Sequence, residues 1–108
     1  MKNHKLITQA INNKQCVSFT FKGLERKMSP HIIGFKKGKR QALFYQYGGK
    51  SSSKLSIEET QNWRCIRVNE IEDLKVIEDT FQTPYNYSVE KQTCIDKVEA
   101  AVSFRWWS

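Results

Sequence analysis

The apolar positions of the chain change their period after the first thirteen residues. Over residues 3–13 they recur three and four positions apart, which is the spacing of one helix face. These positions are Leu6, Ile7, Ala10 and Ile11. Residues 16–21 then alternate, with Val17, Phe19 and Phe21 on one side, as a half-buried strand requires. The pattern therefore predicts a short N-terminal helix followed by a strand.

Further segments of the chain are also typical of strands. They cover residues 26–35, 41–47, 63–68 and 74–77. The first two flank Lys36-Lys37-Gly38-Lys39-Arg40, which predicts a tight antiparallel hairpin turn. Pro30 cannot donate a ladder hydrogen bond, so we expect it at an edge or a bulge. Together with residues 16–21 these short strands, interrupted by a polar loop at 48–56, predict a five-stranded barrel or a strongly bent sheet.

A second helix is predicted near the C-terminus. Between residues 88 and 102, Val89, Ile95, Val98 and Val102 lie near a common helical face, and Ser88 can act as the N-cap. The predicted fold class is mainly β with flanking helices (α+β). We divide the chain into a domain at 1–83 and a C-terminal helix and aromatic tail at 84–108, packed on the barrel or on a partner.

The charge is distributed unevenly along the 108 residues, whose formal net charge is +7. Residues 1–56 contain twelve Lys or Arg against one acid, whereas residues 57–108 contain six against ten. A concentrated positive field attracts polyanions and gains free energy from counterion release, which favours nucleic acid as the partner. A solubilising surface is the alternative.

Cysteine spacing and hydropathy bear on the compartment. Cys16, Cys65 and Cys94 have no metal-type spacing and lie among apolar neighbours, where a thiol packs as a small hydrophobe. We therefore expect a reduced, cytoplasmic protein. No segment approaches the roughly 20 apolar residues that cross a bilayer, so no membrane partner is expected.

The sequence gives little support for catalysis. No nucleophile, base and orienting acid stand in a recognisable motif, and His4 and His31 are the only histidines. We expect no enzymatic activity, no cofactor and no metal site.

Several short pieces, in their order along the chain, resemble the WYL domain family over about residues 7–81. They are Ala10-Ile11, Phe19-Thr20-Phe21-Lys22-Gly23, Arg26, Pro30-His31, the strand from Leu43 to Tyr47, Trp63-Arg64-Cys65-Ile66-Arg67-Val68-Asn69-Glu70-Ile71 and Phe81. Two departures stand out. Ala42, Leu43 and Phe44 take the place of the three residues that name the family, and Glu70 takes the place of a second arginine.

The resemblance implies a barrel like the Sm and Src-homology-3 folds, in a short stand-alone form without the helix-turn-helix. It also implies a ligand-sensing role, with nucleic acid or a nucleotide as ligand. Members of the family commonly act in bacterial transcription regulation, including regulation linked to antiphage defence.

The resemblance assigns Arg26, His31, Tyr47 and Arg67 to the ligand face, beside Arg64. Arginine binds phosphate bidentately, tyrosine can stack on a base, and histidine can donate to phosphate. A core aromatic for Tyr47 and a structural histidine for His31 are the alternatives. Strand alternation puts Arg64 and Arg67 on opposite faces, and we favour Arg67.

Two further groups complete the candidate residues. The cations of the hairpin and the serine loop would add phosphate contacts without choosing bases, or would simply be solvated. They are Lys36, Lys37, Lys39, Arg40, Lys50 and Lys54. At the end of the chain, Phe104, Trp106 and Trp107 are aromatic residues of the kind that favour interfaces, so we expect a homodimer through the last helix and this tail.

These observations predict a non-enzymatic accessory domain that binds single-stranded nucleic acid or a nucleotide. The alternative is a protein-interaction module that acts with a separate effector protein.

Overall fold

The computed structural model describes residues 2–49, 55 and 58–103. Within them lie one α-helix, six strands and two short 3-10 helices. The helix α1 spans Asn3–Asn13, and the strands are β1 (Cys16–Phe21), β2 (Leu24–Lys36), β3 (Lys39–Gly49), β4 (Trp63–Arg67), β5 (Glu72–Ile77) and β6 (Lys97–Ala101). The 3-10 helices are η1 (Glu59–Gln61) and η2 (Val68–Glu70).

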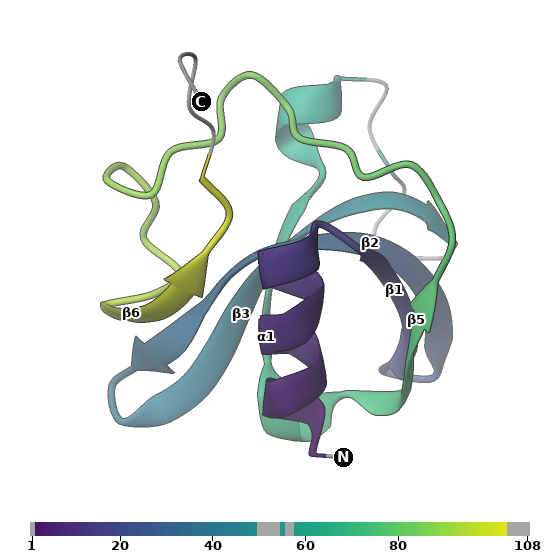
Figure 1. Ribbon diagram of the computed structural model, residues 1–108, viewed down its shortest axis with the longest axis horizontal. Coiled ribbons are helices and arrows are strands. Elements are labelled where there is room, and N and C mark those ends of the chain that lie inside the picture. Colours follow the sequence, from purple (N-terminus) through teal and green to yellow (C-terminus); the bar gives the residue numbers. More distant parts are fainter. Residues whose placement is uncertain (1, 50–54, 56–57, 104–108) are drawn as a thin grey trace.

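The strands form one antiparallel sheet in the order β4-β3-β2-β1-β5, with β6 added to β2. β2 is long enough to take two partners along one edge: Met28 pairs with Val17 of β1, and Ile33 pairs with Ala100 of β6. Figure 1 shows the chain after β5 returning over the top of the sheet to reach β6. β2 therefore organises the whole sheet.

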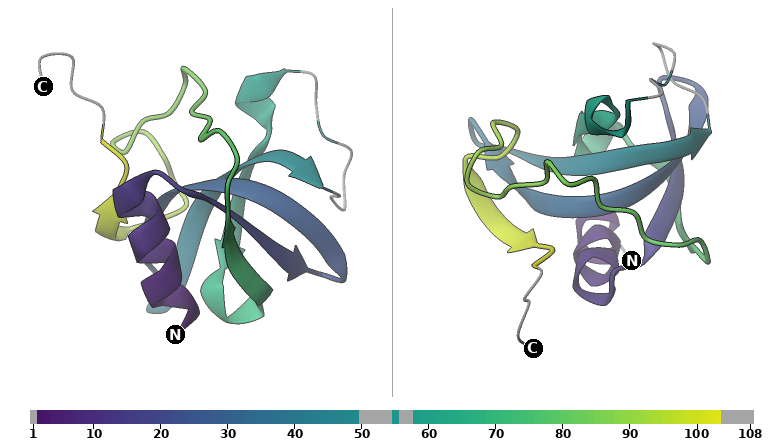
Figure 2. Two further views of the ribbon diagram at one scale, coloured as in Figure 1. Left: turned by 45° about the vertical axis from the view of Figure 1, so that its right-hand side comes forward. Right: turned by 90° about the horizontal axis from the view of Figure 1, so that it is seen from above.

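The sheet is open, so the predicted five-stranded barrel is wrong. Closure would require the two end strands of the sheet to pair, but within the described residues β4 pairs with β3 and β5 with β1. The two views of Figure 2 show β2 and β3 as long, curved strands. The Sm-like barrel that the resemblance implied does not form. The sheet instead has a sixth strand, β6, which the pattern did not predict.

Residues 88–102 do not form the predicted C-terminal helix. Ser88 begins a single turn, because its carbonyl accepts the Gln92 N–H at 3.2 Å and its hydroxyl accepts the Lys91 N–H at 3.2 Å. The Gln92 amide then bonds the N–H and the carbonyl of Ile95, each at 2.8 Å, in place of helical partners. The chain continues as β6 because the free edge of β2 supplies ladder hydrogen bonds.

Other local predictions are confirmed. The N-terminal helix has the expected bounds, and Lys36 pairs with Lys39 across the predicted hairpin. A register shift between Pro30 and Ile32 places the proline at a bulge.

No helix in the described part of the chain is long and apolar enough to cross a membrane.

Two hydrophobic clusters hold the fold together. In the larger one, Ile7 and Ile11 of α1 pack on the sheet near Phe19 and Phe44, whose ring centroids are 5.1 Å apart. In the smaller one, Ile32 and Leu43 pack against Cys94 and Ile95. The second cluster fixes the segment before β6 onto the sheet.

Candidate nucleic-acid interface

His31 is fully buried and belongs to the core of the protein, not to a ligand face. Its Nδ1 lies 2.7 Å from the Ser29 carbonyl and its Nε2 lies 2.8 Å from the Thr83 hydroxyl. Rings of Trp63, Phe81 and Tyr87 surround it at centroid distances of 4.8 to 5.0 Å. Burial lowers the pKa of His31 to about 4, against the opposing effect of its hydrogen bond to the Ser29 carbonyl. The structural alternative for this histidine fits, and the ligand role does not.

Arg26 is buried, whereas the nearby Arg64 is partly exposed. Arg26 is 2% exposed, donates to the Phe21 carbonyl at 3.4 Å and places its guanidinium 4.9 Å from the Phe21 ring centroid. Arg64 donates from Nη1 to the carbonyls of Trp63 and Gln61, at 3.1 and 3.3 Å. Burial and the nearby Arg64 charge lower the pKa of Arg26. The Arg26 guanidinium therefore serves local packing, and the Arg64 guanidinium is engaged by backbone carbonyls.

Tyr47 is part of a polar cluster at the start of β1. Its hydroxyl donates to the Asp79 carboxylate at 2.6 Å. The Cys16 thiol lies 3.5 Å from the Ser29 hydroxyl and donates to the Thr80 carbonyl at 3.5 Å. Burial, followed by the hydrogen bonds to Asp79 and Cys16, raises the pKa of Tyr47. The half-buried tyrosine ties the chain after β5 to β3, and its hydroxyl is already engaged.

The hairpin turn does not present all four predicted cations to solvent. Lys36 forms an ion pair with Asp96 at 3.1 Å, and Arg40 forms a bidentate pair with Glu99 at 3.1 and 3.2 Å. Asp96 lies directly before β6 and Glu99 lies in β6, in the stretch that the sequence pattern predicted to be a helix. Lys37 and Lys39 are exposed and make no ion pair within the described residues.

Arg67 is exposed at the end of β4, as the sequence favoured. It pairs with Gln41 across β3 and β4, and it has no ion pair among the described residues. Glu70, the departure from the family pattern, lies in η2 and is exposed. The cation is therefore accessible.

Lys2, directly before α1, and two cations of β3, Lys39 and Arg40, lie around one depression of about 470 Å³. It is lined by Lys2, Asn3, His4, Lys39, Arg40, Val68 and Asn69. The first turn of α1 is held there by the Asn3 amide, which donates to the Ile71 carbonyl at 3.0 Å. β4 ends at Arg67, directly before Val68. We call this surface, formed by Lys2, His4, Lys37, Lys39, Arg40 and Arg67, the basic end.

The electrostatics of the basic end are visible at His4. Desolvation, followed by the charges of Arg40, Lys5 and Lys2, lowers the pKa of this histidine, while Glu99 acts in the opposite direction. Neighbouring cations lower the pKa of a histidine because they disfavour a further positive charge. Arg40, Lys5 and Lys2 therefore act together on His4, although Glu99 pairs with Arg40.

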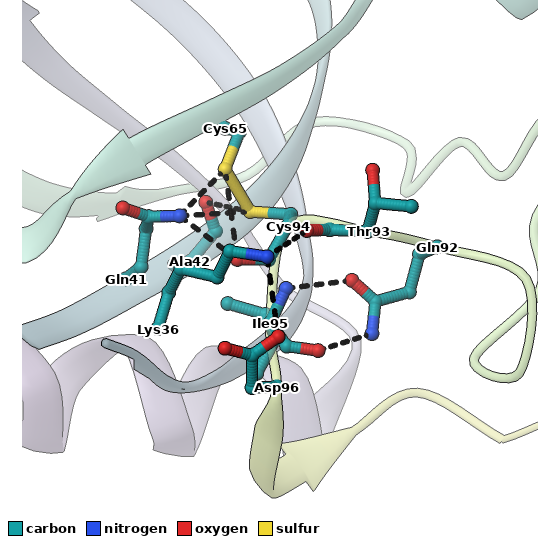
Figure 3. Close-up of a disulfide and its surroundings, with 9 residues drawn as sticks. All are labelled: Lys36, Gln41, Ala42, Cys65, Gln92, Thr93, Cys94, Ile95 and Asp96. Carbon is teal, nitrogen blue, oxygen red and sulfur yellow. Dashed lines mark hydrogen bonds and ion pairs between the residues drawn. A yellow bond between two sulfur atoms is a disulfide. The ribbon is translucent and has the colours of Figure 1, made fainter. Parts of the chain in front are cut away.

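Cys65 and Cys94 form a disulfide, with a Cα separation of 5.8 Å. The expectation of three free thiols is therefore wrong, because β3 brings β4 and the chain before β6 together. Figure 3 shows the Gln41 amide beside the two sulfurs, where it donates to the Cys94 carbonyl at 2.8 Å. Cys16 is the free, buried cysteine. The disulfide staples the chain before β6 to β4.

A second hollow, of about 280 Å³, lies beside the disulfide. Leu43 and Trp63 line it from the sheet, and residues 86–88 and 91–94 line it from the chain between β5 and β6. We call this hollow the cup. Sequence reasoning did not select its residues, because it treated Trp63 as a family marker and residues 88–102 as a helix.

Some predicted residues lie outside the described part of the chain. They are Lys50, Lys54, Phe104, Trp106 and Trp107. Within the described residues, no three His, Cys, Asp or Glu side chains are grouped so that they could hold a metal ion.

No protein-family profile matches the chain, no curated protein is significantly similar to it in sequence, and no solved structure is significantly similar to it in fold. The resemblance to WYL domains therefore stays an expectation from the sequence.

Proposed function

We propose that this protein is a non-enzymatic accessory domain that binds single-stranded nucleic acid through phosphate contacts at the basic end. The observation that carries the proposal is the convergence of Lys2, Lys39 and Arg40 around one depression, with Arg67 next to it. These residues are far apart in sequence, so a merely solvated charge run does not explain their grouping. Lysine and arginine side chains around an accessible depression suit the phosphates of a polyanion.

The acids near the basic end limit its strength but do not cancel it. Glu99 engages Arg40, and Asp96 engages Lys36. Lys37, Lys39 and Arg67 remain exposed for phosphate contacts. A surface of this size favours a few sequence-independent contacts and therefore moderate, salt-sensitive affinity.

We also propose a cytoplasmic location, a compartment in which disulfides are usually transient or redox-sensing. We propose that the Cys65–Cys94 bond is redox-dependent in that setting. The ligand-sensing role that the WYL resemblance implies is compatible with such a bond.

Fluorescence anisotropy with a labelled single-stranded oligonucleotide tests the proposed surface. We expect Lys37→Glu, Lys39→Glu and Arg67→Ala each to weaken binding at low salt, because each removes a phosphate contact or adds a repulsive charge. Lys75→Glu is the matched control, since Lys75 is exposed on β5 and does not line the depression.

If Lys37→Glu, Lys39→Glu and Arg67→Ala all bind the oligonucleotide with the wild-type affinity, as the Lys75→Glu control should, the assigned surface is wrong. Salt-independent binding of a polypeptide, with no binding of the oligonucleotide, would instead favour the protein-interaction module.

A further inference from the structure

The cup has the form of a small-molecule site. Trp63 and Tyr87 stack on each other, with centroids 5.8 Å apart and an interplanar angle of 27°, and both residues line the cup, where this stacked pair forms the aromatic wall. Leu43, which is 8% exposed, also lines the cup, together with Cys94. Pockets for small molecules hold about 300 to 1,000 Å³ and combine apolar walls with a few polar groups. At about 280 Å³ the cup suits one ring system and not a large ligand.

The wall opposite the sheet is fixed before any ligand arrives. Asn86 accepts the Trp63 indole N–H at 3.0 Å and donates to the Thr60 carbonyl at 3.3 Å. Gln92 bonds both backbone groups of Ile95. The disulfide anchors Cys94 to β4. Because these groups are already engaged, they shape the cup and leave recognition to other side chains.

The remaining polar groups define the chemistry of the occupant. Ser88 accepts the Lys91 N–H and keeps its own hydroxyl hydrogen for a ligand. The exposed Thr93 hydroxyl and Lys91 ammonium have no hydrogen bond or ion pair with the described residues. Neutral donors and acceptors beside an aromatic wall suit the polar edge of a flat heterocycle, and one cation at the rim suits an attached anionic group.

We propose that the cup binds a single nucleobase, packed against Trp63 and Tyr87, with its 5′-phosphate at Lys91. Every base offers a π-face, so an aromatic wall accepts bases without strong sequence preference. The base can come from a free nucleotide or from a strand whose other phosphates contact the basic end. The second source rests on the proposed function, whereas the first does not.

Trp63 fluorescence provides a local readout when the other two tryptophans, Trp106 and Trp107, are replaced by phenylalanine. In this background the probes are adenosine 5′-monophosphate, adenosine and a short oligodeoxyadenylate. We expect saturable quenching of Trp63 fluorescence by the ligand. Lys91→Glu should weaken the binding of the monophosphate about tenfold, because a charge-assisted contact is lost. Adenosine has no phosphate, so Lys91→Glu should leave its binding unchanged. Lys75→Glu is the matched charge-reversal control.

Saturation by the monophosphate identifies a free nucleotide as a ligand, and saturation by the oligonucleotide alone identifies a base within a strand. Absence of saturable quenching by all three probes would overturn the proposal. Equal affinity of the parent and Lys91→Glu proteins for the phosphate-bearing probes would also overturn it.

The cup and the basic end can fail separately. Lys39→Glu should lower the affinity for the oligonucleotide without changing the affinity for the monophosphate. Oligonucleotide binding that depends on Lys39 but leaves Trp63 unquenched would retain the basic end and reject the cup.

Discussion

His31 lies among three aromatic rings with a hydrogen-bond partner at each ring nitrogen. A proton added to this site would place a charge in an environment that supplies little solvation. The histidine is therefore held neutral, and its depressed pKa of about 4 couples the fold to acid.

Stability should fall as the pH is lowered from about 6.5 towards 4. In this window the unfolded chain binds a proton at His31 and the folded chain does not, so acid favours unfolding. The loss should approach about 3 kcal/mol at the lower end, because each unit of pKa difference corresponds to 1.36 kcal/mol. Urea titrations across this range measure it.

His31→Gln should be less stable at neutral pH but should lose most of this pH dependence. His4→Gln, at the basic end, should retain most of it. A wild-type stability that is flat between pH 4 and 6.5 would contradict the assignment of a neutral, buried His31.

Residue type and position were enough to predict which of two arginines is exposed. Arg67 is exposed on a strand end, as alternation and resemblance suggested. Arg26 and His31 were assigned by resemblance alone, and sequence gave no measure of their burial. That burial arises from Phe21 on one side and from the chain after β5 on the other, which are tertiary contacts that a local pattern does not contain.

Among the strands, the position of β6 depends on one glycine of β2, Gly34. A Cβ built at Gly34 would lie 2.0 Å from the Lys97 carbonyl oxygen and 2.7 Å from Ile95 Cγ2. Glycine therefore lets the backbone of β6 approach β2 closely.

Gly34→Ala should displace β6 and lower the free energy of unfolding by about 2–3 kcal/mol, as overpacking of a closely packed site does. Gly48→Ala on β3 is the control, because its Cβ would lie 3.4 Å from the flexible Lys27 side chain. Urea denaturation of the two variants measures the difference. Similar stability for both would mean that β6 is not seated against Gly34.

The disulfide should stabilise the same element. It closes a loop with a sequence separation of 29, for which the loss of chain entropy in the unfolded state corresponds to about 3–4 kcal/mol. Reductant should therefore lower the thermal midpoint of the wild type but not that of Cys65→Ser/Cys94→Ser.

Cys16→Ala should respond to reductant as the wild type does, since Cys16 is not in the bond. Alkylation of the denatured, unreduced protein followed by mass spectrometry should modify one cysteine. Three modified cysteines would contradict the bond.

The helix and strand periods were sufficient for α1 and for the hairpin of β2 and β3, where local pairing decides the structure. They failed at residues 88–102. Val98 and Ile95 can be read on a helical face, but the free edge of β2 and the Gln92 side chain supply competing hydrogen bonds. A one-dimensional pattern contains neither competitor.

Over the whole molecule, folding brings cations of the first half of the sequence next to acids of the second half. The basic first half and the acidic second half meet where Asp96 and Glu99 contact Lys36 and Arg40. The charge count therefore overestimated how many hairpin cations are without an ion pair among the described residues.

The salt dependence of binding should report how many contacts remain. For single strands, log K falls with log salt by about 0.7 per neutralised phosphate. Lys2, Lys37, Lys39 and Arg67 are exposed cations of the basic end, so we expect a slope of about −2 to −3. Lys39→Glu should reduce its magnitude by at least about 0.7, whereas Lys75→Glu should not. A slope near zero for the wild type would contradict phosphate binding.

The long strand β2 takes its last partner from near the end of the described chain, since Ile32 pairs with Ala101. During synthesis, half of one edge of β2 must therefore wait unpaired until almost all of these residues have left the ribosome. Unpaired edges can recruit strands from other chains, and long-range pairing slows folding. Truncation before β6 should thus produce an aggregation-prone intermediate, and a nascent chain should be vulnerable until β6 has left the ribosome.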